Sequence, residues 1–332
     1  MSRTLVCTGC SSGLGFEALR QFLTTSNQSS PPWRVLVGCR PRRVQAVQLQ
    51  FQHILQATQT PTSTVKVLDL DLSSRASVKT FAHAVKSELG PSGTIDAILL
   101  SAAVFKHDLT TNSDWTGYTE EAAVNSFAQH YLLHLLEPTI PKDDKTRARV
   151  VFVSSSKQQS IETIAAVHAS LTISVNGTNA SKPMDRYSAS KLVQMLTAQA
   201  WKHTLKGRAD VVAVSPGFVP TSGLNRESPW YLKLFMTYVL ARAPFATTLE
   251  KGASIIRLAI DPDVDDSQLK LELTKSEDSR KVVYIGIGPE ESGTGGWKIY
   301  EPSPLVDQLY FEEQEVWAPS LQSIESGDAK AK

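Results

Sequence analysis

The chain has 332 residues, of which 41% are hydrophobic and 20% charged, and its formal net charge is +1. This composition argues against a disordered chain, a collagen, a disulfide scaffold and a strongly basic nucleic-acid-binding protein. Three cysteines leave one unpaired, and the first apolar segment begins too early for a secretory signal, so we expect a cytoplasmic protein.

Short apolar segments alternate with segments of helical periodicity. Predicted strands cover residues 4–7, 34–38, 65–68, 95–100, 149–153 and 209–214, and predicted helices cover 16–23, 44–57, 76–89 and 187–206, with another long helix ending near Leu136. This alternation indicates β-α-β units and predicts an α/β fold, a doubly wound Rossmann-type parallel sheet in one domain over residues 1–332. Residues 261–332 form a predicted C-terminal extension with a strand at 282–285 and a helix at 305–317.

Membrane-spanning and nucleic-acid-binding segments are not expected. The longest apolar segment tested, residues 230–240, contains Lys233 and is shorter than the ~20 residues that a spanning helix needs. Basic residues do not alternate with aromatic ones as in nucleic-acid-binding proteins. The seven histidines are scattered, so we predict no metal site.

A glycine-rich turn, residues 8–15 (TGCSSGLG), follows the first predicted strand. Glycines permit positive φ angles and a close backbone approach, and the N-terminus of the next helix presents free N–H groups, so the turn can hold a pyrophosphate. The spacing differs from GxGxxG, and a tight structural turn is the alternative.

The second predicted strand ends at Arg40, followed by Pro41, Arg42 and Arg43. An acidic residue at this position would bind the adenosine ribose of NAD, whereas an arginine accommodates the 2′-phosphate of NADP. A solvated basic turn is the alternative. We predict NADPH/NADP+ as the cofactor.

Tyr187 and Lys191 are four residues apart at the start of a predicted helix and therefore share one face. An ammonium group beside a phenol favours the phenolate, so we expect the Tyr187 pKa to be lowered toward the range of a general acid. A surface helix without a catalytic role can show the same spacing. Upstream, Ser154, Ser155 and Ser156 follow a predicted strand at the edge where open α/β sheets bind ligands.

Together these segments resemble the short-chain dehydrogenase/reductase family over about residues 1–260. The matching pieces are TGCSSGLG, Leu70-Asp71-Leu72, Ser101-Ala102-Ala103, Asn125, VFVSSS at 151–156, YSASK at 187–191 and Ser215-Pro216-Gly217. The pattern is closest to retinol-dehydrogenase-like and protochlorophyllide-reductase-like members.

The resemblance implies a role for each matching residue. Tyr187 would protonate a carbonyl oxygen, Lys191 would lower its pKa, Ser155 would orient the carbonyl and Asn125 would anchor a water relay. The implied cofactor-binding residues are Gly9, Ser11, Ser12, Gly13, Leu14, Gly15, Arg40, Asp71, Ser101, Ala102, Tyr187, Lys191, Pro216, Gly217, Val219 and Thr221.

Two departures from the family pattern concern the cofactor site. Residues 100–103 read Leu-Ser-Ala-Ala where the family usually has Asn-Asn-Ala-Gly. Cys10 forms a Cys-x-x-Cys pair with Cys7, which suggests redox chemistry, although two small buried residues are the favoured interpretation.

Residues 222–248 follow the Pro216-Gly217 turn and are rich in large apolar groups, so we predict a substrate lid there. Packing on the domain or on another subunit is the alternative, and a homo-oligomer stays open. Ile161, Ile164, Val167 and Leu171 are expected to form the opposite wall of the substrate site.

We therefore predict an NADPH-dependent reductase of a bulky lipophilic ketone or aldehyde that is polyketide-, terpenoid-, retinoid- or sterol-like. The alternative is a scaffold that binds NADPH for non-redox chemistry (cyclase or isomerase) or as a regulatory sensor.

Overall fold

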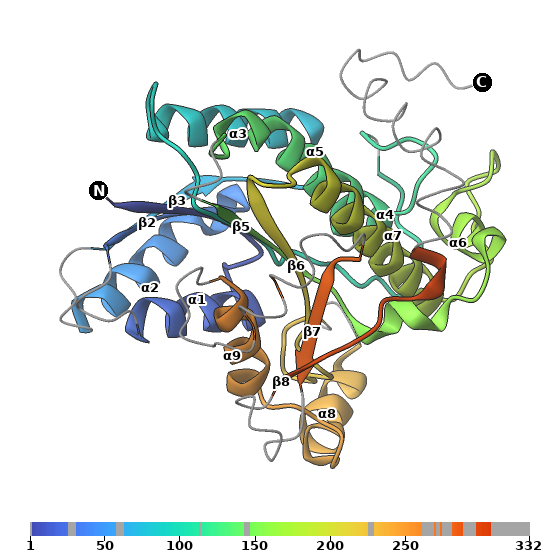
Figure 1. The fold of residues 1–332 in the computed structure, drawn as a ribbon. Helices are drawn as coiled ribbons and strands as arrows, with labels where there is room; N and C mark the ends of the chain where they lie inside the picture. Colours follow the sequence, from blue (N-terminus) through green and yellow to red (C-terminus); the bar gives the residue numbers. More distant parts are fainter. Residues whose placement is uncertain are drawn as a thin grey trace.

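A twisted sheet runs through the centre of the protein in the computed structural model, which describes residues 2–25, 31–57, 63–112, 114–142, 147–224, 229–260, 269, 273, 281–287 and 297–306. Its strand order is β3-β2-β1-β4-β5-β6-β7-β8 (Figure 1). The strands are β1 (Arg3–Thr8), β2 (Trp33–Cys39), β3 (Thr64–Asp69), β4 (Ala97–Leu100), β5 (Ala148–Val153), β6 (Ala209–Ser215), β7 (Val283–Ile287) and β8 (Trp297–Ile299). β1 to β7 pair in parallel, and β8 pairs antiparallel with β7.

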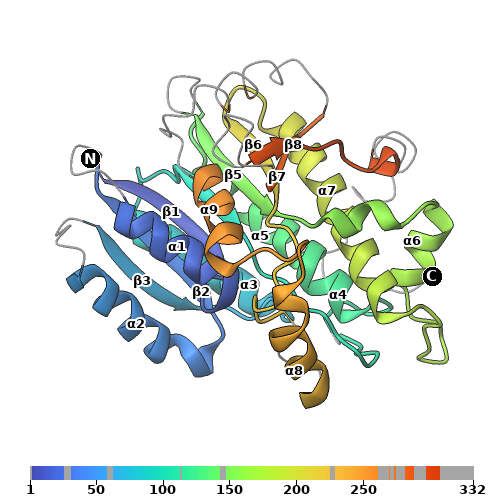
Figure 2. The same ribbon diagram turned by 90° about the horizontal axis from the view of Figure 1, so that it is seen from below.

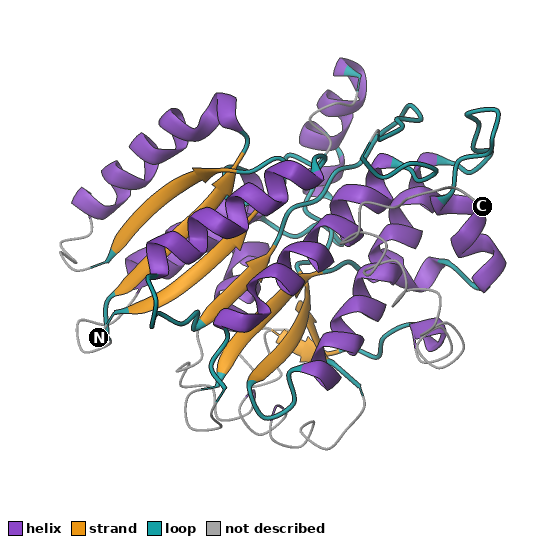
Figure 3. Cartoon of the chain, turned by 90° about the horizontal axis from the view of Figure 1, so that it is seen from above, coloured by secondary structure: helices purple, strands orange, loops and turns teal. Residues whose placement is uncertain are grey.

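Helices cover both faces of the sheet, as Figure 3 shows. The helices are α1 (Gly13–Thr25), α2 (Val44–Ala57), α3 (Arg75–Leu89), α4 (Glu120–Ala122), α5 (Ala128–Leu136), α6 (Ile164–Leu171), α7 (Pro183–Thr204), α8 (Trp230–Tyr238) and α9 (Leu249–Ile260). α1, α2 and α9 pack on one face, and α3, α5 and α7 pack on the other. The predicted doubly wound Rossmann-type sheet is therefore confirmed.

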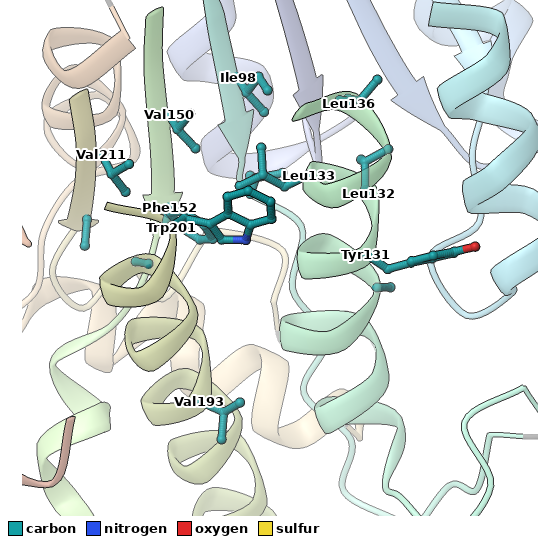
Figure 4. Packing of buried hydrophobic residues seen from close by; sticks show 14 of the residues in the cluster. Ile98, Tyr131, Leu132, Leu133, Leu136, Val150, Phe152, Val193, Trp201 and Val211 are labelled. Atoms are coloured by element: carbon teal, nitrogen blue, oxygen red, sulfur yellow. The ribbon is translucent and has the colours of Figure 1, made fainter. Parts of the chain in front are cut away.

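The core is divided by the sheet because successive strand residues point to opposite faces. Leu5 and Cys7 belong to the cluster under α1 and α9, whereas Val6 belongs to the cluster under α3, α5 and α7. In the second cluster, Trp201 of α7 lies beside Phe152 of β5 (Figure 4). Both faces are thus buried, which explains why the strands read as continuous apolar runs.

The predicted elements agree with the structure at most positions and differ at a few. α7 begins at Pro183 rather than at residue 187, because Pro183 occupies the first turn of the helix after Lys182. Tyr187 therefore lies in the second turn. The predicted strand at 282–285 is β7, β8 was not predicted, and of the predicted helix at 305–317 only residues 305 and 306 lie within the described ranges.

Parallel strands bring the predicted functional residues to one edge of the sheet. The carboxyl ends of β1, β2, β4, β5 and β6 are followed by Gly9, Arg40, Ser101, Ser154 and Pro216, respectively. This edge is where ligands bind in open α/β sheets. Within the described residues, we find no helix long and apolar enough to cross a membrane.

Candidate active site

A cavity of about 350 Å³ opens at this edge of the sheet. Its wall contains most of the residues that we predicted from the sequence to bind a cofactor or to act in catalysis. Those that line it are Gly9, Ser11, Ser12, Leu14, Gly15, Arg40, Asp71, Ser101, Ala102, Ser155, Tyr187, Lys191, Pro216, Gly217 and Val219. Gly13, Asn125 and Thr221 are not among the lining residues.

The glycine-rich turn is closely packed, and a side chain at three of its positions would collide with neighbouring backbone. Gly9 has a φ of 71°, and a Cβ there would collide with the backbone of Ala102. Gly13 has a φ of 60°, and its Cβ would collide with the carbonyl of Ser222. A Cβ at Gly15 would meet the carbonyl oxygen of Gly9 at 2.6 Å. The turn thus brings backbone and the N-terminus of α1 directly to the cavity, which fits a phosphate-bearing ligand.

The far end of the cavity is formed by residues after β2 and β3. Arg40 is exposed, precedes the short helix Pro41–Arg43, and lines the cavity. Asp71 accepts hydrogen bonds from the backbone N–H of Ser73 at 3.0 Å and from its hydroxyl at 2.7 Å. A cationic side chain, rather than a carboxylate, thus follows β2 at the wall of the cavity.

Tyr187 of α7 and Ser155 after β5 both line the cavity. Burial raises the pKa of Tyr187 to about 12, an effect that the nearby Ser155 side chain partly offsets. The predicted lowering of this pKa by Lys191 is wrong, because the effect of burial is larger. At neutral pH the phenol keeps its proton and can donate it.

Lys191 lies beneath Tyr187, with its ammonium nitrogen 5.9 Å from the centroid of the tyrosine ring. Its Nζ donates hydrogen bonds to the carbonyl oxygen of Val153 at 2.7 Å and to Oε1 of Gln194 at 3.0 Å. Burial lowers the Lys191 pKa to about 7. The sequence did not single out Gln194, although its position three residues after Lys191 places both on one helix face.

Asn125 is fully buried in a π-helical turn, Ala123–Phe127, between α4 and α5. Its Oδ1 accepts from the backbone N–H of Val104 at 2.7 Å, and its Nδ2 donates to the Val104 carbonyl and to the Ser190 hydroxyl, both at 3.0 Å. The side chain therefore ties the segment after β4 to α7 and positions both walls of the cavity. The predicted water relay at Asn125 stays a prediction.

Comparisons with known proteins agree with this geometry. A family model described as short chain dehydrogenase matches residues 3–170. A short-chain dehydrogenase/reductase of Pestalotiopsis microspora is 32% identical over 328 residues, which are 98% of this chain and 99% of the relative. The chain belongs to the short-chain dehydrogenase/reductase family. Members of this family are oxidoreductases that use a nicotinamide cofactor.

Other relatives and solved structures extend the likeness. The WW domain-containing oxidoreductase of Gallus gallus is 28% identical, over 76% of this chain and 56% of that protein. Carbonyl reductase Sniffer of D. melanogaster has a TM-score of 0.54 at 14% identity, covering 91% of this chain and 99% of that one. Salutaridine reductase from Papaver somniferum also has a TM-score of 0.54, at 19% identity, covering 79% and 97%. At these identities the structures show the short-chain dehydrogenase/reductase fold.

Several apolar side chains share the cavity with Tyr187. Phe105, Met184, Phe218 and Leu224 line the cavity, and the Phe105 ring stands edge-on to Tyr187 with the centroids 5.8 Å apart. The sequence did not predict Phe105. Phe105 follows the Ser101-Ala102-Ala103 segment after β4. Its position shortly after the end of a strand could have indicated that it lies near the ligand-binding edge of the sheet.

The predicted wall from the insertion before α7 is wrong. Ile161, Val167 and Leu171 belong to the buried core, and Ile164 packs against it, whereas the cavity is lined by Lys157 and Met184 from this part of the chain. The physical reason is that α6 packs against α7 and buries its apolar residues there.

The predicted lid at residues 222–248 contributes Ser222, Gly223 and Leu224 to the cavity. α8, further along, projects from the body of the protein (Figures 1 and 2). The described side chains of α8 are not among the lining residues. Closure of this segment over the cavity stays a prediction.

Cys7 and Cys10 are buried and are not linked by a disulfide bond. Burial raises the pKa of the Cys7 thiol well above its ordinary value, which disfavours the reactive thiolate. In the described ranges, histidine, cysteine and carboxylate side chains form no group of three suited to a metal ion.

Proposed function

We propose that the protein is an NADPH-dependent reductase that delivers hydride to the carbonyl of a bulky lipophilic ketone or aldehyde. The observation that supports this proposal is that Ser155, Tyr187 and buried Lys191 lie together on the wall of a cavity that the glycine-rich turn also lines. NADPH supplies the hydride when bound. The protein must then orient the carbonyl and supply one proton.

Tyr187 is suited to supply the proton because its raised pKa, about 12, keeps the phenol protonated at neutral pH. The Ser155 hydroxyl, which lines the same cavity, can donate to the carbonyl oxygen and orient it. Proton transfer leaves a tyrosinate on Tyr187 and an alcohol as product. The nearby Lys191 ammonium favours this anion when it is charged.

The preference for NADPH over NADH rests on Arg40. Its guanidinium is the cationic group that follows β2 at the cavity wall, and the turn is preceded by uncharged Cys39. An arginine binds a 2′-phosphate by charge-assisted hydrogen bonds. Gly9 and Gly15 allow the turn to pack closely beside the cavity, since a Cβ at either position would collide with backbone, and the N-terminus of α1 there suits a pyrophosphate.

The lipophilic substrate class rests on the apolar residues beside the proton donor. The Phe105 ring contacts the Tyr187 ring, and Phe218 and Leu224 also line the cavity. Burying apolar substrate carbon here contributes about 25 cal/mol per Å². A larger apolar substrate therefore gains affinity from contacts that a small ketone lacks.

The cofactor preference is tested by calorimetric titration of NADPH and NADH into the protein and two variants. Arg40→Ser should weaken NADPH binding by about 10- to 100-fold, the loss of one charged hydrogen-bonding partner, and should leave NADH binding nearly unchanged. Arg42→Ser, an exposed arginine two residues away that is not among the lining residues, is the matched control. Tighter binding of NADH than of NADPH by the unmodified protein would contradict the proposal.

The reaction is tested by following the loss of reduced-nicotinamide absorbance with ketones of increasing apolar size. We expect kcat/KM to rise with apolar size. Cofactor binding without any turnover across the panel would favour a non-redox role and would argue against the reductase.

A further inference from the structure

A set of large apolar side chains is exposed on α8 and just after it. We call this set the α8 surface: Trp230, Tyr231, Leu234, Phe235, Tyr238, Val239 and Phe245. Their relative exposures range from 46% for Leu234 to 73% for Trp230. The α8 members recur at i, i+1, i+4, i+5 and i+8, so they form one face of the helix. Exposed apolar patches of this kind mark contacts with a partner.

The α8 surface is connected to the wall of the active-site cavity. The rings of Phe218 and Phe245 lie 5.9 Å apart, and the backbone N–H of Thr247 donates to the Phe218 carbonyl at 2.8 Å. Phe218 itself lines the cavity. An apolar contact therefore links Phe245 of the α8 surface to the wall of the cavity, and Figure 2 shows α8 projecting from the body of the protein.

The charges of this segment indicate which partner fits. Residues 229–248 include Lys233 and Arg242 and contain no Asp or Glu. Arg242 is exposed, and its guanidinium donates to the Tyr238 carbonyl at 2.6 Å, which holds the cation at the C-terminal end of α8. Aromatic and aliphatic side chains flanked by cations are typical of helices that lie in the interface of an anionic membrane.

A second copy of the chain fits this surface less well. A two-fold symmetric contact would place the same patch opposite itself. Such a contact would bring together two segments that each carry Lys233 and Arg242 and contain no Asp or Glu to pair with them.

We propose that the α8 surface docks on a membrane surface that contains anionic phospholipid. The nine residues of α8 span ~14 Å, too little to cross a bilayer but enough to lie along it. Trp230, Tyr231 and Phe235 would enter the acyl boundary, while Arg242 would meet the headgroups. As a consequence that rests on the proposed function, a lipophilic carbonyl compound would pass from the membrane along Phe245 and Phe218 into the cavity.

Binding is tested by co-sedimentation of the full chain with vesicles of phosphatidylcholine alone or mixed with phosphatidylserine, without cofactor or substrate. We expect binding to the mixed vesicles, weaker binding to pure phosphatidylcholine, and further weakening at high salt. Leu234→Glu with Phe235→Glu should reduce partitioning by about tenfold or more, since both side chains would leave the acyl boundary. Leu49→Glu, at a 56% exposed leucine of α2, is the control and should bind normally.

Trp230 provides a second readout because four other tryptophans, Trp33, Trp115, Trp201 and Trp297, are buried. Mixed vesicles should shift the emission to shorter wavelength, and Trp230→Phe should abolish that shift. The unfolding midpoint of each variant verifies its fold, so a loss of binding cannot be assigned to unfolding.

Three results would overturn the membrane proposal. The first is the absence of binding to mixed vesicles, or an equal loss in Leu49→Glu. The second is a concentration-dependent dimer that Leu234→Glu with Phe235→Glu dissociates, which would assign the surface to a second copy. The third is hydrogen-exchange protection of residues 229–248 by NADPH and a ketone without vesicles, which would indicate the lid. Because vesicle binding needs no turnover, its failure is distinct from failure of the reductase.

Discussion

The ammonium nitrogen of Lys191 lies 5.9 Å from the centroid of the Tyr187 ring, and both groups are buried. Burial favours the neutral form of each, which raises the Tyr187 pKa to about 12 and lowers the Lys191 pKa to about 7. The site therefore places a protonated phenol beside a lysine that titrates near neutral pH.

The lowered Lys191 pKa predicts a pH dependence of stability for the unliganded protein. Between about pH 7 and the unfolded pKa near ~10.4, the unfolded chain binds a proton that the folded protein does not, so the free energy of unfolding rises with pH. The contribution of this group between pH 7 and 9 is roughly 2 kcal/mol. Urea unfolding across this range should show a flatter profile for Lys191→Met; parallel profiles of the two proteins would contradict the assignment.

Gly13→Ala should destabilise the glycine-rich turn more than left-handed strain alone explains. Gly13 and Gly207 both have positive φ angles, 60° and 77°, but a Cβ at Gly13 would strike the Ser222 carbonyl whereas a Cβ at Gly207 has no neighbour within 4 Å. Gly207→Ala should therefore cost about 1–2 kcal/mol, and Gly13→Ala should cost more and weaken NADPH binding. Urea unfolding and calorimetry measure the two effects. Equal costs in both variants would show that the Ser222 contact is unimportant.

His130 predicts a loss of stability in mild acid. Burial lowers its pKa to about 4, and its Nδ1 accepts a hydrogen bond from the Trp201 indole at 2.8 Å, a contact that needs the neutral ring. Below pH ~6.5 the unfolded histidine gains a proton that the folded one resists, so stability falls until about pH 4, by at most about 3 kcal/mol.

His130→Gln keeps an acceptor for Trp201 without the titration. The free energy of unfolding of this variant, measured by urea between pH 7 and 5, should fall less than that of the unmodified protein. An identical fall in both would assign the acid sensitivity to another group.

The sheet could be predicted from the sequence because its strands are buried on both faces. The strands β5 and β6 contain continuous apolar runs, without the alternation of apolar and polar residues that a half-exposed strand shows. The helices between successive strands indicate parallel pairing. β8 was missed because Trp297–Ile299 is short and its side chains are not uniformly apolar. β8 pairs antiparallel with β7, and the periodicity of the sequence within a short segment does not predict which strand it pairs with.

The candidate site was predicted where a residue follows a strand end, as for Arg40 and Ser155. Contacts made across the sequence were harder to predict. Gly13 packs on Ser222, and Asn125 binds Val104 and Ser190, because the tertiary fold brings these segments together. The direction of the Tyr187 pKa shift was wrong for a related reason, since the depth of burial is a property of the folded protein.

The central claim is that Tyr187 donates the proton to the substrate carbonyl. Tyr131→Phe is the matched control, because Tyr131 is a buried tyrosine of the core whose hydroxyl points away from the neighbouring sheet residues (Figure 4). The most direct measurement is the rate of NADPH oxidation with a lipophilic ketone by the unmodified protein, Tyr187→Phe and Tyr131→Phe. We expect kcat to fall by ~10²–10⁴ in Tyr187→Phe alone, with NADPH affinity nearly unchanged. A rate near that of the unmodified protein in Tyr187→Phe would show that Tyr187 is not the proton donor.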